Sequence, residues 1–430
     1  MKKLSGCFCI LLVFSIIFAA CGDGKEGNVL TTTSFTTSNV IYNTTVESTE
    51  APVKEKAVNK IGYIPSNAIF NEENTYFVVS PNGLPNNGNM FVDHSISGNR
   101  GGHFGHAMVE YADGKILAFY PNCNADHNGH SGRGWMEYKR SEDYGKTWSK
   151  AYRLKYSYDT FVASDQERSI ICEKAVVTDD GTIILFCLQC DVKDNALWEP
   201  YFEPTYITST DGGYTWSEPV ELSRMKGRIY DAHVVDGNIY VFAHLDGRYY
   251  MFRSYDGGKS FEEPVHVPMP SGNFYGTTGI LPNGDWIAYT YSEEIENVLY
   301  YSLSSDGGDT WSRYKTTKFD KKIRNPQLIE LNGSYFIMGR SGSYGSESGH
   351  NIIYFSHDGL NWQEGVYLSR RTAGTGAYSN AIVVGTFNND VPNRILYQAS
   401  KAYDKDLTNI LHWWIDAYVV ENSKPQFDFN

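Results

Sequence analysis

Histidine side chains that could transfer protons gather in one part of the chain. Five of the eleven histidines fall between His94 and His130. An imidazole near neutral pH can accept or donate a proton, so two of them flanking a substrate could act as general base and general acid. His106 and His127, about 20 residues apart, are candidates for such a pair. β-Elimination from a uronate sugar needs a pair of this kind, with a cation or hydrogen-bond donor that offsets the enolate charge.

A repeated turn indicates which elements would position these side chains. Five stretches carry a Ser-x-Asp pattern followed by Gly and an aromatic residue, at intervals of roughly 45 to 70 residues: 141–148, 209–216, 254–261, 304–311 and 356–362. The Asp carboxylate can accept N–H groups of its own turn, the glycine can adopt a positive φ, and the aromatic ring can pack as an apolar peg. Self-similarity at this period, between strand-like runs, predicts a β-propeller.

Short runs rich in Val, Ile, Tyr and Phe, broken by Asp-Gly and Asn-Gly turns, predict the strands. Six segments align as the two inner strands of a blade: 106–119, 173–186, 230–242, 276–289, 325–338 and 378–397. The first five precede one repeat each, and the sixth precedes residues 411–420 without a repeat. The sequence therefore predicts an all-β fold, a six-bladed propeller. Residues 75–80 either close the ring or add a seventh blade.

The repeat resembles the Asp-box, or BNR repeat, of the sialidase superfamily, over about residues 101–420. This resemblance implies a sialidase-like propeller in which each Asp-box lies on an outer hairpin, away from the active site. We therefore expect the box aspartates to be structural: Asp143, Asp211, Asp256, Asp306 and Asp358. For the chemistry, the family implies three arginines for the sugar carboxylate, a tyrosine nucleophile beside a glutamate, and an aspartate as acid and base.

One motif matches that chemistry and others depart from it. Tyr378, within Gly376-Ala-Tyr-Ser-Asn380, resembles the family's Tyr-Ser motif and is the candidate nucleophile, with Asp126 as the candidate acid. Where the family has Arg-Ile-Pro in its first blade, this chain has His106 between Gly and Ala. The arginine triad is not found by motif, so the resemblance predicts an atypical hydrolase or another reaction.

The active face also resembles that of propeller-type ulvan lyases and related uronate lyases. Those enzymes have two histidines about 20 residues apart, helped by a tyrosine and an arginine. The resemblance assigns His106 and His127 to proton transfer, with Tyr230 and Arg248 as their helpers. Hydrogen-bonded loop scaffolding or a structural metal ion is the alternative role for the histidines.

In a propeller, the start of the first inner strand and the loop after the second line one mouth, which is a binding-site hypothesis. The catalytic candidates at this mouth are His106, His127, Tyr378, Asp126 and Tyr230. The expected substrate-binding residues are His103, His130, Arg133, Glu173, Asp231, His244, Arg248, Tyr275, Arg324, Arg340 and His350.

The N-terminal sequence predicts export. Residues 1–20 combine two lysines with an apolar stretch that ends in Phe-Ala-Ala before Cys21, a pattern typical of a bacterial lipoprotein signal peptide. The alternative is an ordinary secretory signal. Residues 21–56, the lipidated Cys21 and a Thr- and Ser-rich stretch, predict a disordered tether, and residues 57–430 the propeller domain. We expect a lipoprotein at the bacterial cell surface that contacts the membrane through its lipid anchor only.

The charge and composition of the chain limit which classes of binding partner it can have. The formal net charge is −13, and loss of the two lysines in residues 1–20 makes it more negative, which argues against nucleic acid. We expect an acidic oligosaccharide or polysaccharide as partner, a monomer, and no required cofactor. Cys187-Leu-Gln-Cys190 has the spacing of half a zinc site, but no second pair follows, so no metal site is predicted there. Whether Asp126, His127 and His130 bind a structural metal ion stays open. It also stays open whether the remaining cysteines form one disulfide or are buried thiols.

Three functional hypotheses follow. The first is a surface enzyme that cleaves an acidic glycan as a sialidase-like hydrolase. The second is a polysaccharide lyase that uses histidine and tyrosine for β-elimination. The third is a glycan-binding surface lipoprotein without catalysis, because fold alone does not decide activity.

Overall fold

The computed structural model describes residues 59–61, 63–64, 68–72, 75–80, 89–96, 100–124, 131–194, 199–342, 349–369, 378–403, 407–420 and 426–427. One compact unit spans residues 54–430, and no residue from 1 to 53 is among those described. The predicted signal peptide, Cys21 and the predicted tether are therefore outside the described residues.

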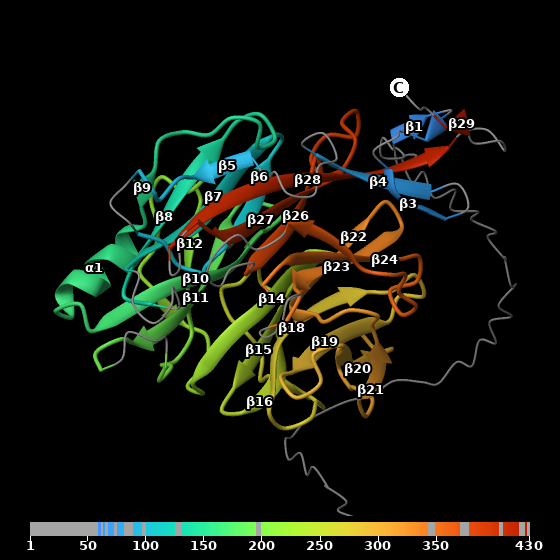
Figure 1. The fold of residues 1–430 in the computed structure, drawn as a ribbon. Helices are drawn as coiled ribbons and strands as arrows, with labels where there is room; N and C mark the ends of the chain where they lie inside the picture. The colour runs from blue at the N-terminus through green and yellow to red at the C-terminus, as the bar shows by residue number, and fades with distance from the viewer. Residues whose placement is uncertain are drawn as a thin grey trace, which may run out of the picture. The chain divides into compact units, whose positions relative to one another are not determined.

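Six sheets form the six blades, which confirms the predicted all-β propeller (Figure 1). The first two blades are β6 (Met108–Ala112), β7 (Lys115–Cys123), β8 (Gly134–Ser141) and β9 (Tyr152–Arg153), then β10 (Arg168–Val177), β11 (Ile183–Asp191), β12 (Thr205–Ser209) and β13 (Val220–Glu221). The third and fourth are β14 (Gly227–Val235), β15 (Asn238–Leu245), β16 (Arg248–Ser254) and β17 (Val265–Val267), then β18 (Asn273–Ile280), β19 (Trp286–Ser292), β20 (Val298–Ser304) and β21 (Lys315–Lys318). The fifth is β22 (Arg324–Leu331), β23 (Ser334–Arg340), β24 (Asn351–Ser356) and β25 (Val366–Ser369). The described residues contain one helix, α1 (Lys155–Ala163), and it is too short to span a membrane.

Strands from both ends of the chain build the sixth blade and close the ring. This blade contains β26 (Ser379–Val384), β27 (Arg394–Ala402) and β28 (Thr408–Val420), with β1 (Asn59–Ile61), β3 (Ala68–Glu72), β4 (Thr75–Ser80) and β5 (Asn89–Val92). The long strand β28 pairs with β5 near its start and antiparallel to β4 near its end (Figure 1). Residues 75–80 therefore close the ring rather than add a seventh blade. The short strands β2 (Tyr63–Ile64) and β29 (Gln426–Phe427) pair separately.

Turn chemistry shapes the hairpins within blades. Asp236 and Gly237, between β14 and β15, have φ of 50° and 74°, the left-handed pair that a tight two-residue hairpin requires. In the repeated turn after β16, the hydroxyl of Ser260 donates to Asp256 at 2.6 Å and its N–H at 3.0 Å, and these bonds lower the pKa of Asp256 to about 2. A Cβ on Gly258 of this turn would lie 2.3 Å from Ile184 of the second blade, so this turn packs tightly against its neighbour.

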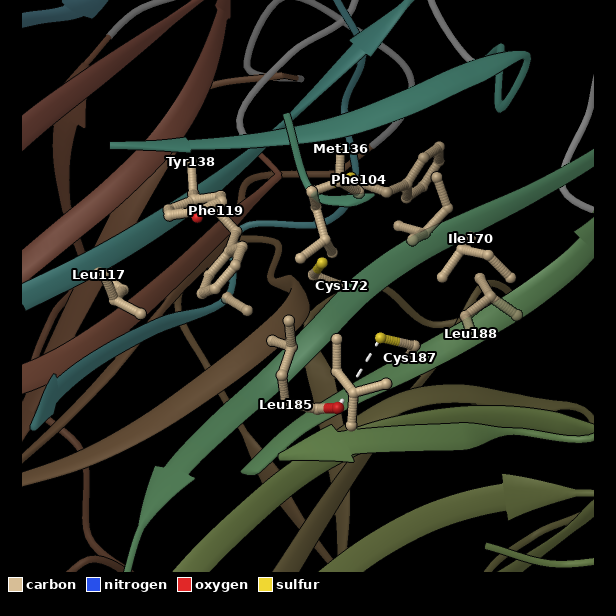
Figure 2. Packing of buried hydrophobic residues seen from close by; sticks show 14 of the residues in the cluster. Phe104, Leu117, Phe119, Met136, Tyr138, Ile170, Cys172, Leu185, Cys187 and Leu188 are labelled. Carbon is tan, nitrogen blue, oxygen red and sulfur yellow. Dashed lines mark hydrogen bonds between the residues drawn. The ribbon is translucent and has the colours of Figure 1, made fainter. Parts of the chain in front are cut away.

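Apolar side chains fill the space between neighbouring blades. Figure 2 shows the cluster where Phe119 and Met136 of the first blade face Ile170 and Leu185 of the second. The inner strands of adjacent blades contact one another in the cyclic order β6, β10, β14, β18, β22, β26 and β6 again. Since burial of such side chains is the main favourable term in folding, these interfaces hold the inner strands that carry the site.

Candidate functional site

Local irregularities in the inner strands aim side chains at one end of the propeller. The pairing register shifts in β10 at Glu173, in β14 at Tyr230 and in β18 at Tyr275. A β-bulge of this kind adds one residue and redirects its side chain. Tyr275 also has a φ of 43°, which is uncommon for a tyrosine and typical of functional sites.

These bulged residues meet in one cavity, which we call the central pocket. Its ionisable and aromatic lining includes His103, Phe104, His106, Glu173, Lys174, Arg228, Tyr230, Tyr275 and Tyr378. The described residues enclose about 50 Å³ here, enough for water but not for a sugar ring. Three neighbouring segments by sequence, 125–130, 343–348 and 370–377, lie outside the described residues. The central pocket is therefore defined here by the described residues alone.

A buried ion pair connects three blades at the central pocket. Nη2 of Arg228 donates to both carboxylate oxygens of Glu173, at 2.9 and 3.0 Å, and Nη1 donates to the hydroxyl of Tyr275 at 2.9 Å. The side chains of Arg228 and Glu173 are only 5% and 6% exposed. Burial raises the pKa of Glu173, and the Arg228 guanidinium opposes that rise.

Tyrosine rings and two further arginines extend the site toward the fifth and sixth blades. The guanidinium carbon of Arg340 lies 4.6 Å from the ring centroid of Tyr378, and Arg340 is the Cα partner of Arg324 across β22 and β23. Arg324 donates to the hydroxyl of Tyr291 at 2.8 and 3.1 Å and pairs with Glu293 and Glu296. All three arginines, Arg228 included, are buried, and Glu173 offsets the charge of Arg228 while Glu293 and Glu296 offset that of Arg324.

Two predicted histidines lie beside the central pocket. The amide of Gln398 donates to Nδ1 of His106 at 3.1 Å and also to the carbonyl of Phe119, and its carbonyl accepts from Nε2 of His412. This network assigns the proton of His106 to Nε2, which has no hydrogen-bond partner among the described residues. Burial lowers the pKa of His106 to about 4. The ring of His103 lies 5.6 Å from that of Tyr378.

Tyr230 is the remaining described candidate for catalysis. Its ring lies 5.1 Å from that of Tyr275 and 5.3 Å from the guanidinium of Arg228. Burial raises the pKa of Tyr230 to about 12, although the charge of Arg228 opposes the rise. Tyr230 is therefore a neutral phenol at physiological pH.

A layer of polar side chains around Lys174 bounds the central pocket on one side, and we call it the polar layer. Nζ of Lys174 lies 3.2 Å from Asp231, 2.6 Å from Gln327 and 2.7 Å from Asn380, so it joins four blades. Asp231 also accepts from the hydroxyl of Thr277. Burial raises the pKa of Asp231, but Lys174 and the other donors hold it well below its usual value. The structure thus places Asp231, expected to contact substrate, in this layer.

Other expected substrate contacts lie away from the central pocket. Arg133 donates to backbone carbonyls of Val192 and Lys193, and Arg248 is exposed where β16 begins. The ring of His244 packs 4.5 Å from that of Tyr249, and burial lowers its pKa. His350 packs against Tyr367. Asp126, His127 and His130 lie outside the described residues.

Sequence reasoning missed Arg228, Lys174 and Tyr291. Arg228 stands two residues before Tyr230 at the start of β14, and Lys174 directly follows Glu173. A basic residue within two positions of Glu173 and of Tyr230 was the available signal for Lys174 and Arg228. No three His, Cys, Asp or Glu side chains within the described residues converge to hold a metal ion.

Comparisons with known proteins come from sequence and from structure. Residues 191–403 match the family model described as the DUF6242 beta propeller domain. No curated protein matches the chain.

Solved structures share the fold at low identity. A protein of unknown function from Dyadobacter fermentans is 16% identical, with a TM-score of 0.57, over 74% of this chain and 96% of that one. A mutant of the NanB sialidase from Streptococcus pneumoniae is 11% identical, with a TM-score of 0.56, over 78% and 71% of the two chains. The Hadza microbial sialidase Hz136 is 13% identical, with a TM-score of 0.55, over 74% and 66%. The chain therefore has a sialidase-like propeller fold.

Proposed function

We propose that this protein is an enzyme that cleaves glycosidic bonds of an acidic glycan by hydrolysis. The observation that carries the proposal is the position of Tyr378 beside the Arg340 guanidinium, 4.6 Å from its ring, with Arg324 as the strand partner of Arg340. Guanidinium groups bind carboxylates in a fixed planar geometry, so this arrangement suits a sugar with a carboxylate near the bond that breaks. The sialidases that share the fold support a glycan as substrate.

In the proposed hydrolysis, the phenolic oxygen of Tyr378 attacks the anomeric carbon and its proton passes to solvent water. The glycosidic C–O bond breaks, and Asp126 protonates the leaving oxygen. Water then attacks the anomeric carbon and gives a proton to Asp126, the bond from the sugar to Tyr378 breaks, and the Tyr378 phenolate regains a proton from solvent. Arg340 holds the sugar carboxylate and offsets its charge through both steps, and Arg324, already paired with Glu293 and Glu296, lies opposite it on the neighbouring strand.

A second candidate, β-elimination on a uronate, is favoured by the hydrogen bonding of His106. Its Nε2 carries the proton, and His106 lines the central pocket together with Arg228. In this mechanism His106 and Arg228 donate to the substrate carboxylate as it becomes an enolate, His127 removes the adjacent proton, and the neutral phenol of Tyr230 protonates the leaving oxygen.

Product analysis separates these chemistries. The protein is incubated with sialylated and with uronate-containing glycans, and the products are weighed and scanned for ultraviolet absorption. Hydrolysis gives fragments that have gained water. Elimination gives fragments without added water that absorb as unsaturated uronates. Absence of any cleavage, together with measurable glycan binding, would contradict both mechanisms and favour the glycan-binding hypothesis.

A variant pair tests the role given to His106. Replacement of His106 by Gln is expected to reduce elimination by roughly a hundredfold or more if His106 acts on the substrate. His266→Gln is the matched control, because His266 is exposed on β17. Equal rates for the two variants would remove His106 from the mechanism.

A further inference from the structure

A second cavity lies beneath the polar layer that contains Lys174, and we call it the axial cavity. It has a volume of about 750 Å³ and is lined by inner-strand residues of all six blades. Lys174 and Asn380 border both the axial cavity and the central pocket. The two cavities therefore lie on opposite sides of one polar layer, and the axial cavity is separate from the proposed active site.

The walls of the axial cavity are mainly apolar. Val177, Val234, Ile280, Ile329 and Ile382, one from each of five blades, line it and are all partly exposed. Small-molecule sites are usually concave, several hundred cubic ångströms in volume and apolar, with a few polar groups that orient the ligand. The axial cavity meets this description, whereas the central pocket does not.

The charges at the cavity argue for a neutral ligand. All three N–H donors of Lys174 can be taken up by Asp231, Gln327 and Asn380. Glu110 and Glu330 also line the cavity and accept backbone N–H groups. An anion would be repelled by these carboxylates, whereas the hydrogen bonds that they already accept reduce, without removing, their attraction for a cation.

His233 supplies the polar contact that would orient a ligand. Its Nε2 lies 3.0 Å from the hydroxyl of Thr278 and 3.4 Å from the carboxylate of Asp231, which assigns the ring proton to Nε2. Nδ1 is then an acceptor, and none of the described residues is bonded to it. The side chain of His233 is 28% exposed and lines the cavity.

We propose that the axial cavity binds a neutral, compact apolar molecule that donates a hydrogen bond from a hydroxyl or N–H group to Nδ1 of His233. The site is independent of glycan cleavage, because it lies on the other side of the Lys174 layer. Its ligand differs from the proposed substrate in having no charge and an apolar body.

Benzyl alcohol and toluene are suitable probes, because they share an apolar body and differ in the hydroxyl donor. Binding to the protein is followed by NMR of the imidazole of His233, whose resonances are identified by their loss in His233→Phe. We expect saturable shifts with benzyl alcohol and roughly fivefold weaker binding of toluene, the factor that one hydrogen bond contributes. Imidazole resonances of His233 that stay unmoved by benzyl alcohol would overturn the proposal.

A filled cavity provides the second test. Val234→Trp is expected to abolish benzyl alcohol binding, whereas Val220→Trp, at an exposed position of β13, is expected to keep it. Ile382→Trp fills the cavity from the sixth blade if Val234→Trp does not fold. Equal binding by a filled variant and by Val220→Trp would place the probe elsewhere and refute the site.

Discussion

Replacement of Arg228 by methionine is expected to destabilise the protein by about 3–5 kcal/mol, the cost of stranding a buried charge. Methionine keeps an apolar stem but leaves the carboxylate of Glu173, 6% exposed, without its partner at 2.9 Å. Glu173 would then take up a proton, because burial already raises its pKa. A raised acid pKa gives stability that is present at low pH and lost as pH rises, so the variant should lose less stability near pH 4 than near pH 8.

A second substitution, at Glu173, tests whether Arg228 and Glu173 are energetically coupled. Adding Glu173→Gln to Arg228→Met removes the stranded charge and should restore about 1–3 kcal/mol. Urea unfolding is followed by circular dichroism and by tryptophan fluorescence, whose coincidence checks that the transition is two-state. The control is Arg253→Met, since Arg253 pairs with two exposed carboxylates, Asp309 and Glu262, and should contribute less than about 1 kcal/mol. Two results would show that Arg228 and Glu173 are not coupled. One is a loss of stability in Arg228→Met no larger than in this control. The other is a double variant whose loss of stability equals the sum of the losses in the two single variants.

The remaining predictions concern other parts of the chain. Burial lowers the pKa of His106 to about 4, so as pH falls below about 6.5 the unfolded state takes up a proton on this histidine before the folded state does. We therefore expect His106 to cost roughly 3 kcal/mol of the free energy of unfolding between pH 6.5 and 4. His106→Gln should remove this part of the pH dependence of stability measured by urea unfolding. Asp143→Ala removes acceptors for the N–H and hydroxyl of Thr147 and should cost about 1–2 kcal/mol without changing glycan cleavage; a large loss of cleavage at full stability would contradict a structural role. Burial raises the pKa of the Cys172 thiol, which is 0% exposed, so a thiol reagent should label it only after denaturant is added, as mass spectrometry of its peptide would report. Cys21→Ala should move the protein from the membrane fraction to the soluble fraction, whereas an unchanged distribution would refute lipidation at Cys21.

Local signals were enough to predict the fold. The Asp236-Gly237 turn adopts the left-handed conformations that its residue types favour. The repeat also fixed the order of strands within five blades, since each copy joins the third strand to the fourth. Ring closure was harder to predict, because the pairing of β4 with β28 joins residues about 340 positions apart and leaves no local pattern.

The site was predicted at the level of strands but not of side-chain directions. The predicted mouth positions Glu173 and Tyr275 do reach the central pocket. A one-residue bulge at Tyr230 changes which neighbours point to the mouth, so Asp231 joins the layer of Lys174 while Arg228 enters the pocket. A bulge depends on tertiary packing, and strand alternation alone cannot reveal it.

The most direct test of the central claim compares two tyrosine variants on an acidic glycan that the protein cleaves. Tyr378→Phe keeps the ring that packs under Arg340 and removes only the hydroxyl, whereas Tyr255→Phe changes an exposed tyrosine in a repeated turn. The proposed hydrolysis predicts that kcat/KM falls by roughly a hundredfold or more in Tyr378→Phe and stays unchanged in Tyr255→Phe. Equal kcat/KM in the two variants, with both proteins folded, would contradict the claim that Tyr378 reacts with the sugar.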